Sequence, residues 1–116
     1  MDGSNNTVEK PWGSYTDIFR SDEVVFKKIV IGPGEEISYQ QHQKRGEFWY
    51  VIQGVGMFRW NNINGWKVRP GFTVQIKKND THQMINTGEE DMVVYEMQYG
   101  KCLEEDIVRI EDKYGR

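Results

Sequence analysis

The chain has 116 residues, with 15 basic and 18 acidic side chains and a formal net charge of −3. A chain of this length forms one domain with a sizeable core, and its acidic balance argues against nucleic acid as a partner. The mean hydropathy of −0.75 and the lack of a long apolar run exclude a transmembrane span. The polar N-terminus lacks an apolar core and a cleavage-site pattern, so we expect no secretory signal, and the single cysteine, Cys102, cannot form an intrachain disulfide. We therefore expect a cytoplasmic protein that contacts neither nucleic acid nor membranes.

Strand-like runs separated by turn signals follow one another along the chain, a pattern typical of a sandwich or barrel. In chain order, the predicted strands cover residues 24–31, 37–42, 47–53, 57–60, 66–68, 72–76, 82–86 and 92–97. Residues 61–65, rich in Asn and Gly, predict a hairpin loop because these residues tolerate a positive φ. Only the tail, residues 104–109, has a spacing that predicts a short C-terminal helical turn. The predicted fold class is all-β.

The two histidines, His42 and His82, each lie in a predicted strand. Residues i and i+2 of a strand share a face, so Gln40 and His42 point to the same side. If residues 37–42 and 47–53 pair as a hairpin, Glu47 lies within reach of that face.

The spacing of these residues between glycines resembles the two paired motifs of the cupin superfamily. The positions that carry the likeness are Gly34, Gln40, His42, Glu47 and Gly54, followed by Gly71, His82 and Asn86. Cupins are double-stranded β-helix (jelly-roll) barrels, in which such positions bind one divalent metal ion. The resemblance implies that Gln40, His42, Glu47 and His82 are the metal ligands. Because glutamine replaces the usual first histidine, the set favours Zn²⁺, or else Mn²⁺ or Co²⁺, over an iron centre for O₂ chemistry.

Three segments resemble the type II phosphomannose isomerase family more closely: residues 10–15, 37–49 and 98–116. In longer members of that family, the cupin domain follows a nucleotidyltransferase domain. Here we expect a stand-alone cupin domain over residues 10–116 after a flexible N-terminus at 1–9, without guanylyltransferase activity.

The resemblance implies a metal-dependent aldose–ketose isomerase that interconverts mannose 6-phosphate and fructose 6-phosphate, a small-molecule sugar phosphate partner and a homodimer. Arg45 and Lys44 would supply charge for the enediolate or the phosphate, and Arg109 is a further phosphate candidate. Glu96 is one possible general base.

Several residues depart from the family pattern and keep an alternative open. Gln43, Lys44 and Phe48 replace histidines that the family commonly has. The alternative is a non-enzymatic metal-binding cupin that binds a sugar or sugar phosphate. Each candidate residue also has a structural interpretation: the histidines as hydrogen-bonded strand residues, Glu47 as an ion-pair partner on a surface turn, and Arg109 as a partner of Asp106 or Asp112.

Overall fold

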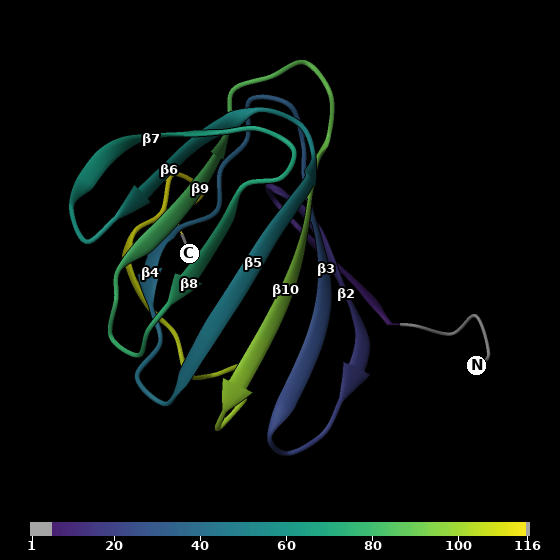
Figure 1. Cartoon of the computed structure of the whole chain (residues 1–116), viewed down its shortest axis with the longest axis vertical. Coiled ribbons are helices and arrows are strands. Elements are labelled where there is room, and N and C mark those ends of the chain that lie inside the picture. Colours follow the sequence, from purple (N-terminus) through teal and green to yellow (C-terminus); the bar gives the residue numbers. More distant parts are fainter. Residues whose placement is uncertain (1–5, 116) are drawn as a thin grey trace.

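The computed structural model describes residues 6–115 and shows two antiparallel sheets that face each other (Figure 1). Sheet A contains, in order, β1 (Thr7–Lys10), β2 (Gly13–Arg20), β3 (Val24–Ile31), β10 (Met92–Gly100), β5 (Arg45–Gln53) and β8 (Thr73–Ile76). Sheet B contains β11 (Val108–Glu111), β4 (Tyr39–Gln41), β9 (His82–Asn86), β6 (Gly56–Trp60) and β7 (Ile63–Val68). Among the described residues there is no helix, so none could cross a membrane. The all-β prediction is confirmed.

Side chains on the long strands of sheet A alternate between the interior and the outer face. Along β3 every second residue is buried, and β10 and β5 show the same period of two. The buried side chains are apolar at one end of these strands (Ile29, Ile31, Val51, Met92 and Val94) and mostly polar at the other (Lys27, Glu47, Glu96 and Gln98, beside Val25). The barrel therefore has an apolar end, which supplies the core, and a polar end, which supplies the site.

The hairpin between β6 and β7 confirms the turn that the Asn- and Gly-rich loop predicts. Trp60 pairs with Ile63 across a two-residue turn. Asn61 and Asn62, its two central residues, have φ values of 48° and 66°. Asparagine adopts this left-handed region more readily than most residues, and such turns match the twist of the strands.

Two predictions about strand pairing and the tail are wrong. Residues 37–42 and 47–53 do not form a hairpin, because β4 pairs with β9 and β11 in sheet B while β5 pairs with β10 and β8 in sheet A. Residues 104–109 do not form a helical turn: residues 104–105 form a turn, and β11 then pairs with β4. An isolated helical turn is costly to nucleate, whereas the open edge of β4 offers backbone partners.

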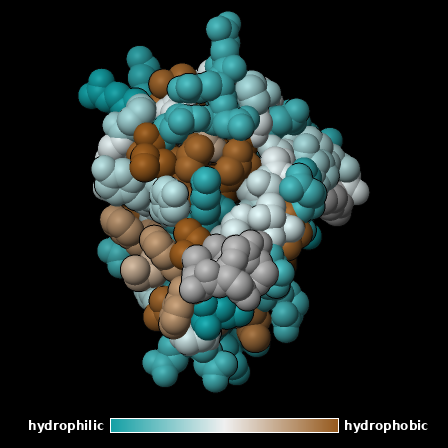
Figure 2. Space-filling model, turned by 90° about the vertical axis from the view of Figure 1, so that its right-hand side faces the viewer, coloured by the Kyte–Doolittle hydropathy of each residue, from teal (hydrophilic) through white to brown (hydrophobic). Residues whose placement is uncertain are grey.

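The N-terminal region contains strands that the sequence does not predict. Residues 7–9, assigned to a flexible N-terminus, belong to β1, which pairs with β2; residues 1–5 lie outside the described residues. Most side chains of β2 are half-buried and none is fully buried, so its sequence lacks a strong alternation. Figure 2 shows the side of the molecule that carries β2 and β3, where groups of apolar side chains reach the surface among polar ones.

Candidate metal centre and pocket

Three buried side chains from both sheets meet in the polar end of the barrel. His42 directly follows β4, His82 begins β9 and Glu47 lies on β5, and one potential ligand atom of each lies within 4.8 Å of the others. The Glu47 carboxylate lies between the imidazoles, with Oε2 3.2 Å from His42 Nε2 and Oε1 3.6 Å from His82 Nε2. These side chains come together because β4 and β5 lie in the two sheets that face each other.

The second nitrogen of each imidazole is held by a backbone carbonyl. His42 Nδ1 lies 2.6 Å from the Asp106 carbonyl oxygen, and His82 Nδ1 lies 3.2 Å from that of Asp80. A carbonyl only accepts, so each Nδ1 carries the hydrogen and each Nε2 is an acceptor. Burial lowers the pKa of His42 below its usual range and lowers that of His82 to about 3, so both rings are neutral near pH 7.

These residues fit a divalent metal ion. Two ligands of a tetrahedral ion with bonds near 2.1 Å lie about 3.4 Å apart, close to the separations between Glu47 and the two imidazoles. His82 Nε2 is buried and, among the described residues, has no hydrogen-bond partner. A buried acceptor without a partner costs free energy, which a metal bond would remove. Imidazole held by a carbonyl on its far nitrogen is the usual arrangement of metal-bound histidine.

Gln40 lies at the edge of this cluster. Its Nε2 is 3.4 Å from His42 Nε2, and its Oε1 accepts a hydrogen bond from Ser38 Oγ at 2.6 Å. Gln40 also pairs directly with His82 across β4 and β9. Gln40 would bind a metal ion through its amide oxygen, so its amide group would have to turn over. The role of Gln40 as the fourth ligand therefore stays a prediction.

Arg45 is buried within the cluster. Its Nε donates to Glu47 Oε2 at 2.9 Å, Nη2 donates to His42 Nε2 at 3.2 Å and Nη1 donates to the Leu103 carbonyl at 3.2 Å. The guanidinium thus neutralises the same carboxylate that would ligate a metal ion. An ion held by His42 and Glu47 would replace the contact between Arg45 Nη2 and His42 Nε2.

A second buried carboxylate, Glu96, lies next to Glu47. The Trp49 indole N–H points between the two, 3.0 Å from Glu47 Oε1 and 2.9 Å from Glu96 Oε2, and Gln98 Nε2 donates to Glu96 Oε1 at 2.9 Å. Burial, and next to it the charge of Glu47, raise the pKa of Glu96 to about 7. Glu96 can therefore hold or release a proton near neutral pH.

A pocket of about 170 Å³ opens beside this cluster. Gln40, His42, Arg45, Glu96 and Arg109 line it. Lys44 does not: it is exposed on the turn before β5, where its backbone N–H donates to Asp106. The structure thus places Lys44 outside the pocket, contrary to the role in binding charge assigned to it from the sequence.

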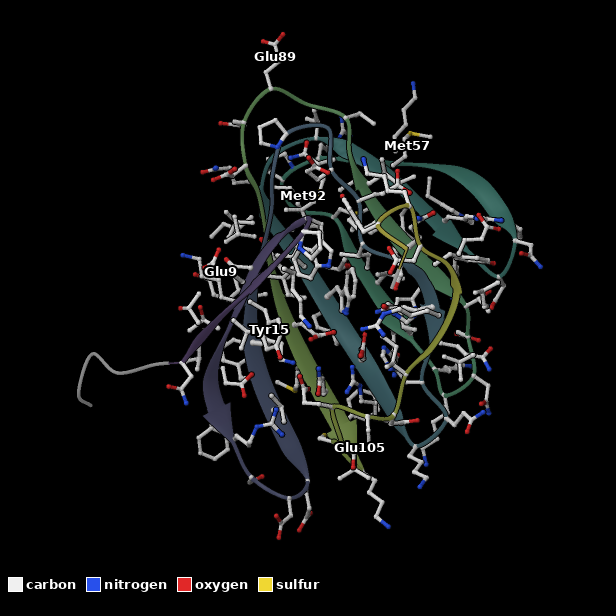
Figure 3. All side chains as sticks on the ribbon, turned by 180° about the vertical axis from the view of Figure 1, so that it is seen from behind. Glu9, Tyr15, Met57, Glu89, Met92 and Glu105 are labelled. Carbon is white, nitrogen blue, oxygen red and sulfur yellow. The ribbon has the colours of Figure 1, made fainter. Side chains whose placement is uncertain are left out.

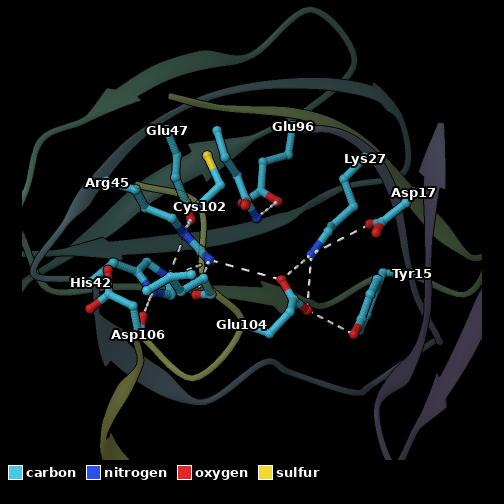
Figure 4. A network of polar contacts seen from close by, with 12 residues as sticks. Tyr15, Asp17, Lys27, His42, Arg45, Glu47, Glu96, Cys102, Glu104 and Asp106 are labelled. Carbon is cyan, nitrogen blue, oxygen red and sulfur yellow. Dashed lines mark hydrogen bonds and ion pairs between the residues drawn. The ribbon is translucent and has the colours of Figure 1, made fainter. Parts of the chain in front are cut away.

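The polar residues of the pocket that were missed in the sequence include Tyr15, Lys27 and Glu104 (Figure 4). Lys27 is only 4% exposed, and its Nζ donates to Glu104 at 3.0 and 3.4 Å. Tyr15 donates its hydroxyl hydrogen to the same carboxylate at 2.8 Å. The signal for Lys27 is its place between Val25 and Ile29 on the inward face of a predicted strand; Glu104 leaves no comparable signal.

Curated proteins that resemble this chain align with 94% of it. They include the mannose-1-phosphate guanylyltransferase ManC of Salmonella typhimurium, at 37% identity, the xanthan biosynthesis protein XanB of Xanthomonas campestris, at 34%, and the alginate biosynthesis protein AlgA of Pseudomonas aeruginosa, at 32%. The chain spans 23% of the length of each of these relatives.

These relatives correct the predicted activity. One is named a mannose-1-phosphate guanylyltransferase and the others are named for xanthan and alginate biosynthesis; none of the three names specifies an isomerase. The similarity establishes the kind of domain. The prediction that this chain interconverts mannose 6-phosphate and fructose 6-phosphate is therefore wrong.

Solved structures with low sequence identity share the fold. The capsular polysaccharide assembling protein CapF of Staphylococcus aureus superimposes with a TM-score of 0.81 at 22% identity, over 93% of this chain and 33% of that one. An uncharacterized conserved protein with a double-stranded beta-helix domain from Klebsiella pneumoniae gives 0.74 at 17% identity, over 97% and 90%. These likenesses confirm the predicted fold, a double-stranded β-helix.

A family profile shows to which protein family the chain belongs. Residues 2–112 match the family described as "Mannose-6-phosphate isomerase C-terminal". The match covers both sheets and all the residues of the metal cluster and the pocket. This chain belongs to the Mannose-6-phosphate isomerase C-terminal family of cupin domains.

Proposed function

We propose that this chain is a metal-binding cupin domain whose ion helps to hold a small carbohydrate ligand in the adjacent pocket. The observation that carries the proposal is the buried cluster of His42, Glu47 and His82, in which two neutral imidazoles and a carboxylate bring three acceptor atoms within 4.8 Å of one another. Nitrogen and oxygen donors of this kind suit Zn²⁺ best, with Mn²⁺ and Co²⁺ as further candidates.

The chain's own residues would orient the ligand. A bound ion would supply a Lewis acid that attracts a hydroxyl or carbonyl oxygen. Arg45, already held by the Leu103 carbonyl, can donate to an oxygen of the same ligand. Glu96 faces the pocket and can accept or donate a hydrogen bond according to its protonation. Trp12 and Trp49 add apolar walls against which a sugar ring can pack.

Metal uptake by the whole chain tests the proposal. We expect one Zn²⁺ per chain after exchange of the chelator-treated protein into a zinc buffer, measured by elemental analysis after gel filtration. Co²⁺ should bind at the same site, because these donors also accept it, and should give visible absorption typical of four or five ligands. His82→Gln is the matched variant, since it replaces the buried imidazole with a neutral polar side chain. Equal zinc content in both proteins would contradict the proposal.

The predicted homodimer stays a prediction, and the outer face of sheet A is the surface we expect to form it. The outward side chains of β3, β5 and β10 are mainly apolar and include the exposed Phe48, Tyr50, Ile52 and Met97. Lys28 is the one charged side chain among them, so the face can meet its own copy without repulsion over a wide area. Aromatic side chains contribute on the order of 100 Å² each when half-exposed, and this face approaches the roughly 800 Å² per partner of a stable interface.

Tyr50→Glu should convert such a dimer to a monomer, because the carboxylate would be buried without a partner. Ile63→Glu, a similar change at an exposed site on β7, should leave the dimer intact. Sedimentation velocity separates monomer from dimer. A concentration of about 100 μM lies well above the Kd of a stable dimer, so an unmodified protein that is monomeric at this concentration would contradict the prediction.

A further inference from the structure

Residues 101–107 form a strap between the two sheets and belong to neither of them. The strap leaves sheet A at the end of β10 and enters sheet B as β11, which pairs with β4. In Figure 3 the strap, which carries the labelled Glu105, passes in front of the interior side chains of the barrel. Glu104 and Ile107 line the pocket, so the strap is also part of the pocket wall.

Asp106 joins this strap to the metal cluster through both its backbone and its side chain (Figure 4). Its backbone carbonyl oxygen lies 2.6 Å from His42 Nδ1. Its carboxylate accepts the backbone N–H groups of Gln43 and Lys44 at 2.9 and 2.8 Å, one with each oxygen. Such hydrogen bonds to a charged acceptor are stronger than neutral ones, and successive backbone N–H groups commonly hold an anionic group. The carboxylate therefore fastens the strap to the turn that follows His42, and the carbonyl of the same residue contacts the ring.

The neutral His42 ring can carry its hydrogen on either nitrogen. Its Nε2 lies 3.2 Å from Glu47 Oε2, so a ring with the hydrogen on Nε2 would donate to a buried carboxylate. That nitrogen would then no longer be an acceptor and could not bind a metal ion. The Asp106 carbonyl favours the opposite tautomer, because it can accept only from Nδ1–H. Arg45 Nη2, which lies 3.2 Å from His42 Nε2, adds to this preference, since a guanidinium only donates.

His82 does not depend on a remote segment in this way. It begins β9, where it pairs with Gln40 and Trp60, and its Nδ1 lies 3.2 Å from the carbonyl oxygen of Asp80, two residues before it. His42 directly follows β4, and the partner of its Nδ1 is 64 residues further along the chain. The orientation of His42 therefore depends on the strap, whereas that of His82 is set by its own turn. His82 thus serves as an internal reference.

We propose that Asp106 is a positioning residue of the metal centre: its carboxylate holds the strap in place, so that its carbonyl keeps the His42 hydrogen on Nδ1 and leaves Nε2 as an acceptor for the metal ion. The inference rests on the proposed function, because Asp106 prepares the same metal site. Loss of the Asp106 carboxylate releases the strap from the turn, and the His42 hydrogen then moves to Nε2, where it binds Glu47. The conformation of the strap and the metal affinity of the barrel are therefore coupled.

The tautomer of His42 in the metal-free protein tests this role without any bound ion. Nitrogen chemical shifts of isotope-labelled histidine, measured by NMR on the chelator-treated full chain, show which nitrogen carries the hydrogen. At pH 8, above the ordinary histidine pKa of about 6.5, the rings are neutral. The chain has two histidines, and His82→Gln assigns their signals. The unmodified protein should carry the hydrogen on Nδ1 in both rings. In Asp106→Ala, His42 should change to Nε2–H, while His82 should keep Nδ1–H.

Zinc affinity of the same proteins, measured by competition with a chelator, gives the consequence for the metal centre. Loss of a residue that orients a metal ligand typically costs about 10- to 100-fold in metal affinity, and we expect a loss in this range for Asp106→Ala. Asp106→Asn keeps one acceptor oxygen, so it should bind zinc with intermediate affinity; it also covers the case in which the alanine variant folds poorly. Glu105→Ala removes the same charge from the neighbouring, exposed position of the strap and should change neither the zinc affinity nor the His42 tautomer.

The inference fails if His42 keeps Nδ1–H in both Asp106 variants, because a weaker zinc site with an unchanged tautomer would make Asp106 a merely structural residue. It also fails if Glu105→Ala loses as much zinc affinity as Asp106→Ala, since the loss would then come from charge alone. Normal zinc affinity in every variant would remove this inference and leave the metal site standing. Absence of zinc binding by the unmodified protein would remove the proposed metal site and this inference with it.

Discussion

Glu47→Gln should lower the affinity of the chain for Zn²⁺ by at least about 100-fold, because it removes the one carboxylate that lies between both imidazoles. The amide would still occupy the space but would bring no charge to balance the ion. Competition with a chelator of known zinc affinity measures the change. Glu104→Gln is the control, since Glu104 contacts neither histidine. An equal loss in both proteins would contradict the assignment of Glu47 as a ligand.

The same substitution should also weaken the metal-free protein. Glu47 is fully buried and holds the buried Arg45 guanidinium at 2.9 Å. Removing one partner of a buried ion pair leaves the other charge uncompensated and costs about 3 kcal/mol. Urea unfolding in the presence of a chelator measures this loss. Zinc should raise the stability of the unmodified protein and leave that of Glu47→Gln unchanged, because only the former binds the ion in its folded state.

Glu96→Gln should stabilise the metal-free protein by about 2 kcal/mol at pH 8. A carboxyl group whose pKa is raised on folding destabilises the folded state when it is ionised, and the shift of Glu96 corresponds to a free energy of that order. The pKa of Glu96 rises from its ordinary value of 4.5 to about 7 on folding. Between these pH values the folded chain binds a proton that the unfolded chain does not, so stability falls as the pH rises. The neutral amide removes this loss. Gln98 Oε1, buried without a partner among the described residues, can accept from the new amide if Gln98 turns over.

Urea midpoints at pH 5 and pH 8 test the sign of this effect. The gain from Glu96→Gln should be small at pH 5 and largest at pH 8. His82 acts in the opposite sense: its pKa falls to about 3 on folding, so the unfolded chain takes up a proton between the ordinary histidine pKa of about 6.5 and 3, and stability is lost on acidification in that range. A gain from Glu96→Gln that is equal at both pH values would contradict the raised pKa.

The positions of His42, Glu47 and His82 could be predicted from the sequence, but the way they meet could not. Spacing and the period of two along a strand place Gln40 and His42 on one face. The same local rules suggest a hairpin between residues 37–42 and 47–53, because nearby strands usually pair. The actual partners of β4 are β9 and β11, and pairing over such distances leaves no local trace in one sequence.

The side of the pocket that holds Glu104 shows the same limit. Arg45 and Glu96 could be proposed from the sequence because a family resemblance or a strand pattern points to them. Glu104 depends on the path of the segment after β10, which brings it back against β2 and β3. Its polar and apolar spacing suggests a helical turn, yet tertiary contacts with Lys27 and Tyr15 determine its conformation. Local propensity is a weak guide where such contacts compete with it.

The pairing of β3 with β10, and of β4 with β11, joins segments that are far apart along the chain. Contacts of this kind form slowly, because the entropy of closing long loops is lost before the contacts stabilise the chain. His42, Glu47 and His82 can share an ion only after both sheets have closed, so a half-folded chain does not offer the three ligands together. During refolding, zinc uptake would therefore mark completion of the barrel, and the ion would prolong the life of the native state by slowing unfolding rather than by speeding folding.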